Sequence, residues 1–256
     1  MRWTLLLDAP RPGWANMALD SALLDLAAGE GAAFLRLYRW EPHCLSFGRH
    51  EPALRRYDVE RIRSLELDCV RRPTGGRAVW HARELTYAVA APLAAFGGLR
   101  EAYGAIHGLL ASALRLLGAT PALAPPPATR HLPPSAGPCF AAPVGGEVTV
   151  GGRKVIGSAQ LRQNDAFLQH GSLLLEDAQD LVRSLAGLPE APAAEAPLSA
   201  VLGRTVSFPE AATAVVECAE ALLGGMERPG ELPAPAAAAA RRHEERFRSA
   251  AWTWQR

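Results

Sequence analysis

Hydrophobic positions recur with helical or strand spacing along most of the chain, and this pattern predicts its elements. Apolar residues at helical spacing follow Asn16, which can cap a helix, over 16–28, and Gly29 ends the run. Alternating polarity over 34–40 predicts a strand. The same reasoning predicts helices at 58–65, 103–117 and 241–247, and strands at 44–48, 68–72, 85–90 and 168–175.

Residues 147–156 give the clearest hairpin signal, because Gly151-Gly152 separates two β-prone runs. The proline- and alanine-rich residues 119–138 fit an extended loop better than a regular element. Helices and strands interleave irregularly, and the sequence has no internal repeat. The predicted fold class is therefore α+β (α/β), a large mixed β-sheet packed with helices.

Composition narrows the classes of function. The 256 residues are 49% hydrophobic, which suffices for a substantial core, and the net charge of +1 gives no global field for nucleic acid. The N-terminal apolar run is too short for a signal peptide, and no run approaches the ~20 apolar residues of a membrane span. We therefore expect a cytoplasmic protein with no nucleic-acid or membrane partner.

The 4 cysteines are scattered without a C-x-x-C pair, which argues against a zinc site and a disulfide framework, so no metal site is expected. Cys139 ends the proline-rich loop, where a thiol is accessible to substrates. The alternative, a buried thiol that fills a gap, is the commoner fate of cysteine and fits Cys44, Cys69 and Cys218 better.

Lys154 is the only lysine in the chain, and arginine supplies every other basic side chain among the 27 lysines and arginines. Lysine offers a compact charge and three rotatable donors, so a single retained lysine indicates a position that needs lysine chemistry. The competing interpretation is an arginine-rich composition in which one lysine remains by chance. The small residues Gly157-Ser158-Ala159 that follow would let another molecule approach the backbone.

Two further stretches could contact a ligand. Thr74-Gly75-Gly76 forms a tight turn whose amides can face a ligand, although an exposed hairpin tip has the same composition. By its residues alone, His81 fits a hydrogen-bonded core histidine better than a ligand contact. Polar residues at 169–172 interrupt an apolar strand and must find partners, so they form either a structural hydrogen-bond network or a pocket wall.

Together these stretches resemble the biotin/lipoate protein ligase superfamily. The resemblance rests on RRPTGGRAVWH at 71–81, GRKVIGSAQ at 152–160 and LQHGS at 168–172. NMALD at 16–20, LSFG at 45–48 and FRSAAW at 247–252 also match in order, so the similarity spans nearly the whole chain. It implies one catalytic domain over 1–256, with a core at about 30–225, a C-terminal helix at 241–250 and no accessory C-terminal domain.

Members of this superfamily bind a medium-chain acyl group and move it to one lysine of a lipoyl carrier domain. The resemblance implies that Lys154 positions and polarises the acyl carbonyl and that Cys139 carries the acyl group. The acyl- or substrate-binding residues that it implies are Arg72, Thr74, Gly75, Gly76, Arg77, His81, Gly157, Ser158, Ala159, Gln160, His170 and Gly171.

Two branches of the superfamily differ in chemistry. Lipoate ligases spend ATP on lipoyl-adenylate and usually have glycine and aspartate where this chain has Arg77 and Ala82. Single-domain octanoyltransferases use a cysteine in a PCF-type stretch just before the lysine hairpin, as at Cys139-Phe140, and need no cofactor. The chain resembles the second branch more closely. ATP and Mg²⁺ would enter only if it were a ligase.

The implied partners are acyl carrier protein and the glycine cleavage H protein or other lipoyl domains. Two alternatives stay open: an amidotransferase that moves octanoyl or lipoyl between carrier proteins, and a protein whose Lys154 is itself the acyl acceptor. Acidic carrier domains would suit a local basic patch, whereas the same arginines could also form an ordinary solvated surface. The arginines within or beside the motifs are Arg49, Arg71, Arg72, Arg77, Arg83 and Arg162.

Overall fold

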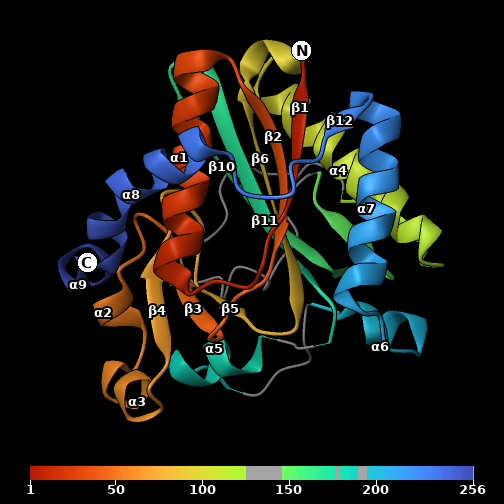
Figure 1. Ribbon diagram of the computed structural model, residues 1–256. Coiled ribbons are helices and arrows are strands. Elements are labelled where there is room, and N and C mark those ends of the chain that lie inside the picture. The colour runs from red at the N-terminus through yellow and green to blue at the C-terminus, as the bar shows by residue number, and fades with distance from the viewer. Residues whose placement is uncertain (125–145, 177–178, 190–194, 256) are drawn as a thin grey trace.

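The computed structural model describes residues 1–124, 146–176, 179–189 and 195–255, and its centre is a six-stranded sheet in the order β10-β11-β6-β2-β1-β12 (Figure 1). The strands from β10 to β2 pair antiparallel, whereas β2, β1 and β12 pair parallel. This arrangement confirms the predicted mixed sheet. The strands are β1 (Trp3–Leu7), β2 (Ala33–Tyr38), β6 (Glu84–Pro92), β10 (Ile156–Gln163), β11 (Ala166–Leu174) and β12 (Met226–Glu227).

Two three-stranded sheets, β4-β3-β5 and β7-β8-β9, flank the central one. In the second, Gly151 and Gly152 have φ of 57° and 75°, a conformation that glycine adopts without strain, and they turn β8 directly into β9. The predicted hairpin is thereby confirmed. These strands are β3 (Cys44–Phe47), β4 (Asp68–Arg71), β5 (Val79–His81), β7 (Pro121–Leu123), β8 (Val148–Val150) and β9 (Arg153–Lys154).

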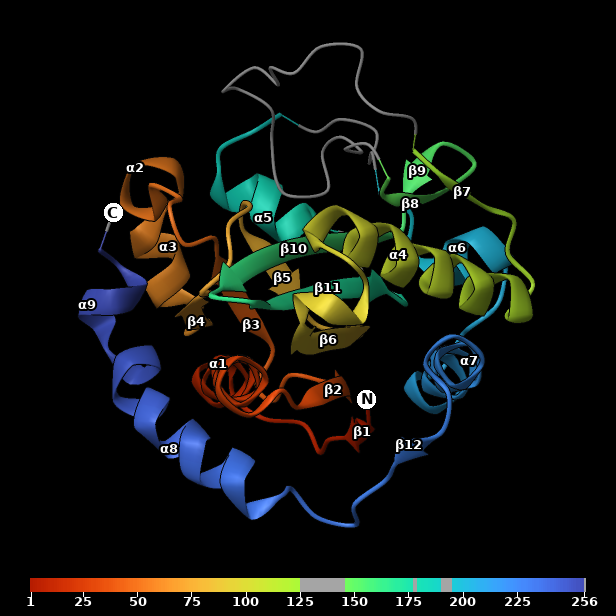
Figure 2. The ribbon, with the colours of Figure 1, turned by 90° about the horizontal axis from the view of Figure 1, so that it is seen from above.

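Helices cover both faces of the central sheet (Figure 2). Helix α1 (Gly13–Glu30) packs on one face with α8 (Ala234–Arg248) outside it, and α4 (Leu99–Leu116) packs on the other face beside α7 (Phe208–Leu223). The sheet therefore separates two hydrophobic clusters, and a central strand such as β6 is buried along almost its whole length.

Shorter helices connect these layers, and one of them shows a clear cap. The N-cap Asp58 accepts a hydrogen bond from the Arg61 amide, which explains why α3 starts where the sequence predicts. No helix within the described residues is long and apolar enough to span a bilayer. The short helices are α2 (Ala53–Arg56), α3 (Val59–Ser64), η1 (Leu93–Ala95), α5 (Asp180–Leu185), α6 (Leu198–Leu202) and α9 (Ala250–Thr253).

Some predicted boundaries were wrong. Helix α1 begins at Gly13, and Asn16 lies inside it, where its side-chain amide donates to the carbonyls of Arg11 and Arg39 instead of capping the helix. Helix α8 begins at Ala234, before the predicted start at 241, because the alanines that follow are strong helix formers. Strand β7 lies within the predicted loop 119–138, and the sequence analysis placed no element at β1 or α7.

The glycine turn at 75–76 packs directly on the end of β3. A Cβ atom on Gly48 would overlap the carbonyl oxygen of Gly76, so only glycine lets these two backbones approach so closely. The amide of Arg49 also donates to the carbonyl of Thr74 at 2.8 Å. The turn is thereby held in one position relative to the small sheet.

We expect Gly48→Ala to destabilise the fold by about 3 kcal/mol, because the added methyl group meets backbone that cannot move aside. Gly104→Ala in α4 is the matched control, since its Cβ would meet nothing within 4 Å and alanine favours a helix by up to ~1 kcal/mol. Urea unfolding measures both variants. Equal stability of the two would contradict the close approach at Gly48.

Candidate functional site

A small cavity opens where α1 meets β2, β5, β6, β10 and β11. Seven residues implied by the resemblance line it: Arg72, His81, Gly157, Ser158, Ala159, His170 and Gly171. Ser172 also lines it, as one of the polar residues at 169–172 for which a pocket wall was one prediction. Five further lining residues were not predicted: Met17, Tyr38, Trp40, Val79 and Thr86.

Three implied residues lie behind the lining and hold it in place. Thr74 Oγ1 lies 2.7 Å from Nε2 of His170. The carbonyl oxygens of Gly75 and Arg77 accept hydrogen bonds from the Arg72 guanidinium at 3.2 and 2.7 Å. The turn therefore orients Arg72 through backbone carbonyls and His170 through the Thr74 hydroxyl. That its amides face a ligand stays a prediction.

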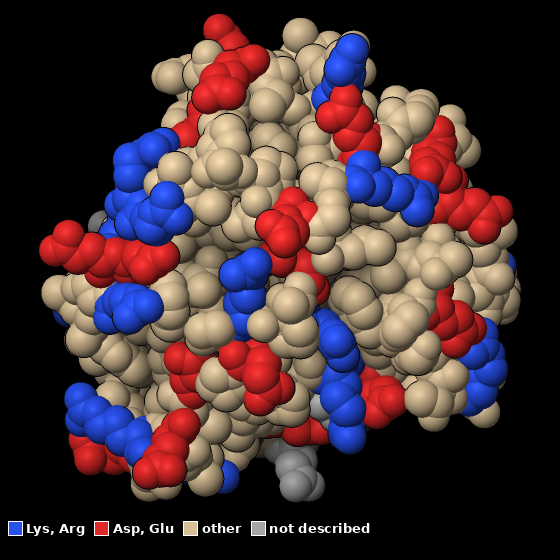
Figure 3. Space-filling view, viewed as in Figure 1, with Lys and Arg blue, Asp and Glu red and all other residues tan. Residues whose placement is uncertain are grey.

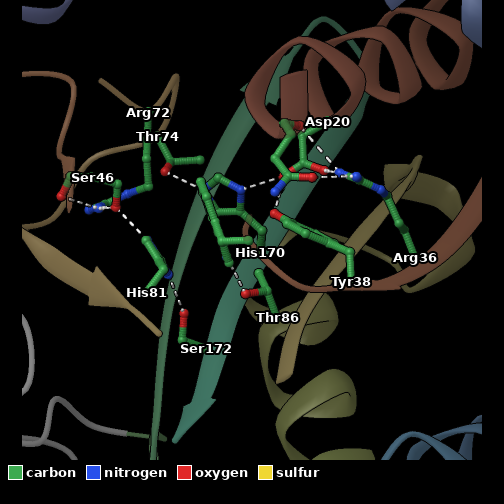
Figure 4. A network of polar contacts seen from close by, with 12 residues as sticks. Asp20, Arg36, Tyr38, Ser46, Arg72, Thr74, His81, Thr86, His170 and Ser172 are labelled. Carbon is green, nitrogen blue, oxygen red and sulfur yellow. Dashed lines mark hydrogen bonds and ion pairs between the residues drawn. The ribbon is translucent and has the colours of Figure 1, made fainter. Parts of the chain in front are cut away.

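A buried carboxylate fixes the α1 side of the cavity (Figure 4). Asp20 accepts hydrogen bonds from the guanidinium of Arg36 at 2.7 Å and from the hydroxyl of Tyr38 at 2.9 Å, and its Oδ2 lies 2.8 Å from Nδ1 of His170. Burial would raise the pKa of the Asp20 carboxyl, but the hydrogen bond from His170 and the charge of Arg36 hold it below its ordinary value. Asp20 therefore stays ionised and locks the three donors.

His81 forms a second buried cluster. Its Nδ1 lies 2.7 Å from a Glu84 oxygen, its Nε2 lies 2.5 Å from the Ser46 hydroxyl, and its ring stacks on Trp40 with centroids 4.0 Å apart. Burial lowers the pKa of His81, and a carboxylate can only accept, so the neutral ring carries its proton on Nδ1. His81 is thus a hydrogen-bonded core histidine, as its residues alone indicated, and it also lines the cavity.

A third network lies on the opposite face of the sheet, because successive residues of a strand face opposite sides. The hydroxyl of Ser158 lies 2.9 Å from Nε2 of His107 and 2.7 Å from the hydroxyl of Tyr87. Gln169 donates to the same Tyr87 hydroxyl and accepts from Gln160, each at 2.9 Å. The side chain of Gln160 therefore lies outside the cavity lining, beneath α4.

Lys154 belongs to this α4 side as well. Its Nζ donates to Oε1 of Glu147 at 2.7 Å, and both side chains are almost fully buried. Gly157 lines the cavity, whereas Lys154, three positions earlier in the chain, is not among the lining residues. Cys139 lies outside the described residues, so its predicted role stays a prediction.

Cys44 is buried, as the sequence predicts, whereas Cys69 and Cys218 are partly exposed. Burial raises the pKa of Cys44 well above its ordinary value and that of Cys69 to about 12. A thiol with a raised pKa is a poor nucleophile at neutral pH. These two cysteines are therefore unsuited to carry an acyl group.

The prediction that six arginines form a basic surface patch is wrong for two of them. Arg71 and Arg72 are buried, and they donate to backbone carbonyls, for example of Thr253 and Ser46, so neither reaches an approaching protein. These guanidinium groups hold loops together, because each has several fixed donors for carbonyl acceptors. On the face seen in Figure 3, basic and acidic residues are interspersed.

Comparisons with known proteins identify relatives of this chain. A model of the lipoyl protein ligase A/B catalytic domain matches residues 12–220. Octanoyltransferase LipM of Symbiobacterium thermophilum is 37% identical over 248 residues, which cover 90% of this chain and 89% of the relative. Octanoyltransferase LipM of Exiguobacterium sibiricum is 34% identical over 99% of both chains.

Solved structures share the fold. Lipoate-protein ligase A bound with ATP is similar with a TM-score of 0.84 and 20% identity over 99% of each chain. The bi-partite lipoate protein ligase of Thermoplasma acidophilum has a TM-score of 0.73 and 18% identity, and the match covers 99% of this chain and 96% of that one. These likenesses confirm the predicted catalytic-domain fold.

We expect Asp20→Asn to destabilise the protein by about 3 kcal/mol, because it leaves the buried Arg36 charge without one of its two carboxylate partners. Glu60→Gln breaks the exposed pair with Arg63 and should change stability by less than about 0.5 kcal/mol. Chemical unfolding of both variants at pH 7 is the measurement. A small effect of Asp20→Asn would contradict the locking role of this carboxylate.

Stability should also depend on pH through His107. Burial lowers the pKa of His107 from 6.5 to about 4, with the charge of Lys154 adding to the effect. The imidazole of His107 therefore binds a proton more tightly in the unfolded chain than in the folded one. Its contribution to the free energy of unfolding is complete above pH 6.5 and is lost as the pH falls towards 4. The loss from pH 7 to pH 4 is about 3 kcal/mol and should disappear in His107→Gln. An unchanged pH dependence in that variant would disprove this assignment.

Proposed function

The chain belongs to the lipoyl protein ligase A/B catalytic domain family and is an octanoyltransferase of protein lipoylation, and we propose that it carries the octanoyl group as a thioester on Cys139. The donor is octanoyl acyl carrier protein. The acceptor is the lysine of a lipoyl carrier domain, with the glycine cleavage H protein as the first candidate. The reaction needs no cofactor.

The observation that carries this proposal is the form of the cavity. Apolar side chains of Met17, Trp40 and Val79 line it, and the backbone of Gly157 and Ala159 gives a smooth wall that a flexible alkyl chain can follow. The strand that supplies this wall continues directly from the hairpin of Lys154. An acyl chain in the cavity would therefore lie along the strand that continues from that hairpin.

The first step is thioester exchange on Cys139. Its thiolate attacks the carbonyl carbon of the donor, the bond from that carbon to the carrier sulfur breaks, and the carrier thiolate takes up the proton that Cys139 released. A nearby ammonium favours the thiolate form and can donate to the oxyanion that develops on the carbonyl. Lys154 is the only residue of the chain that can supply an ammonium from a side chain.

The second step forms the amide. The neutral amine of the acceptor lysine attacks the octanoyl thioester, the bond from carbon to the Cys139 sulfur breaks, and the proton released by the amine returns to that sulfur. Donor and acceptor thus bind in turn, in ping-pong order. An ATP-dependent lipoate ligase, the second candidate, would form an acyl-adenylate instead and would leave Cys139 as a bystander.

Intact-mass analysis after incubation with octanoyl acyl carrier protein tests the proposal. We expect one octanoyl adduct without ATP, its absence in Cys139→Ala, and its retention in the control Cys218→Ala, whose thiol lies on helix α7. An adduct that persists in Cys139→Ala would refute the thioester. Activity of that variant with free lipoate and ATP would favour the ligase.

A further inference from the structure

One imidazole joins both ends of the segment that carries Lys154. His107, on α4, is fully buried, and its Nδ1 lies 2.6 Å from the carbonyl oxygen of Gly146 while its Nε2 lies 2.9 Å from the hydroxyl of Ser158. Gly146 precedes β8, and Ser158 lies on β10. The hairpin with Lys154 is the chain between these two contacts.

The protonation of this histidine is determined by its neighbours. A carbonyl oxygen only accepts, so Nδ1 carries the proton, and a neutral ring then accepts the Ser158 proton at Nε2. Burial, opposed by the hydrogen bond to Gly146, lowers the pKa of His107 to about 4, which keeps the ring neutral at physiological pH. The Tyr87 hydroxyl accordingly donates to Ser158, and Gln169 donates to Tyr87.

The contact at Gly146 is adjacent to the lysine. Glu147 follows Gly146 directly, and its carboxylate accepts the hydrogen bond from Lys154. Gly146 has a φ of 87°, so its peptide orientation is one that glycine tolerates and other residues rarely adopt. The Tyr103 ring, on the same helix, packs against the imidazole of His107 at an interplanar angle of 55°, with centroids 4.0 Å apart.

We propose that His107 is a positioning residue for acyl transfer, which acts by clamping the Lys154 segment against α4 through Gly146 and Ser158. The inference rests on the proposed function of Lys154. Loss of one contact frees one end of the hairpin, and a displacement of about 1 Å at a reacting group can cost about 10²-fold in rate. Binding of the carriers, which involves the protein surface, should change little.

The sole lysine of the chain provides a direct test, because amine-selective reductive methylation modifies only Lys154 and the N-terminal amine. In the folded wild type the buried Lys154 should react at least 10-fold more slowly than the N-terminal amine. His107→Ala should remove this protection, and His107→Asn, whose amide can still reach the Gly146 carbonyl, should keep part of it. Peptide mass mapping reports each site separately.

The activity assay gives the second readout. We expect His107→Ala to lower kcat for octanoyl transfer about 10²-fold with KM for both carriers within about twofold, and His107→Asn to recover part of the loss. His243→Gln is the control, because this histidine pairs with Asp25 on α1, outside the cavity lining, and should leave both readouts at wild-type values.

The two proposals fail in different ways. A wild type that forms no octanoyl adduct would refute the thioester, yet the methylation rates would still report on the clamp. Folded His107→Ala or His107→Asn variants that keep Lys154 as protected as in the wild type would overturn the clamp. If His107→Ala does not fold, His107→Asn and Ser158→Ala, each lacking one contact, decide the question.

Discussion

The carboxylate of Asp20 is fully buried, and the shape of the cavity depends on the donors that reach it. Asp20 lies on α1, whereas Arg36 and Tyr38 come from β2 and His170 from β11. A buried charge that loses its partners costs several kcal/mol, so the helix cannot shift relative to these strands. This wall of the cavity is thus held by electrostatics as well as by packing.

The central sheet separates the cavity from the network that contains His107. The networks of His170 and His81 lie on the α1 side, where the cavity is, and the network of His107 lies on the α4 side with Lys154. Strand β10 serves both, because Gly157 and Ala159 pair with residues of the α1 side while the Ser158 side chain reaches α4. One strand can therefore transmit the position of the hairpin to the wall of the cavity.

Local signals predicted local features well. The turn at Gly151-Gly152 could be predicted because it depends on these two glycines alone. The polar residues of β11 were expected to form hydrogen bonds, and His170 and Ser172 do so with Asp20 and Glu84. Strand β1 escaped prediction because its short apolar run shows no alternation, as expected where both faces are covered. The interior place of Arg71 depends on Thr253, far along the chain, and no local pattern encodes that contact.

Contacts between residues distant in the sequence also explain which site residues could be predicted. The lining residues of β10 and β11 lie in compact motifs, whereas Met17 and Tyr38 reach the cavity only because α1 packs on those strands and β2 pairs with β6, the neighbour of β11. The proposed mechanism requires that the octanoyl group be bound covalently to the enzyme before it reaches the acceptor lysine. Octanoyl-enzyme isolated free of donor and ATP should, in a single turnover, transfer its group stoichiometrically to the lysine of the apo H protein. Failure of this isolated species to transfer, when the complete mixture does, would contradict the account.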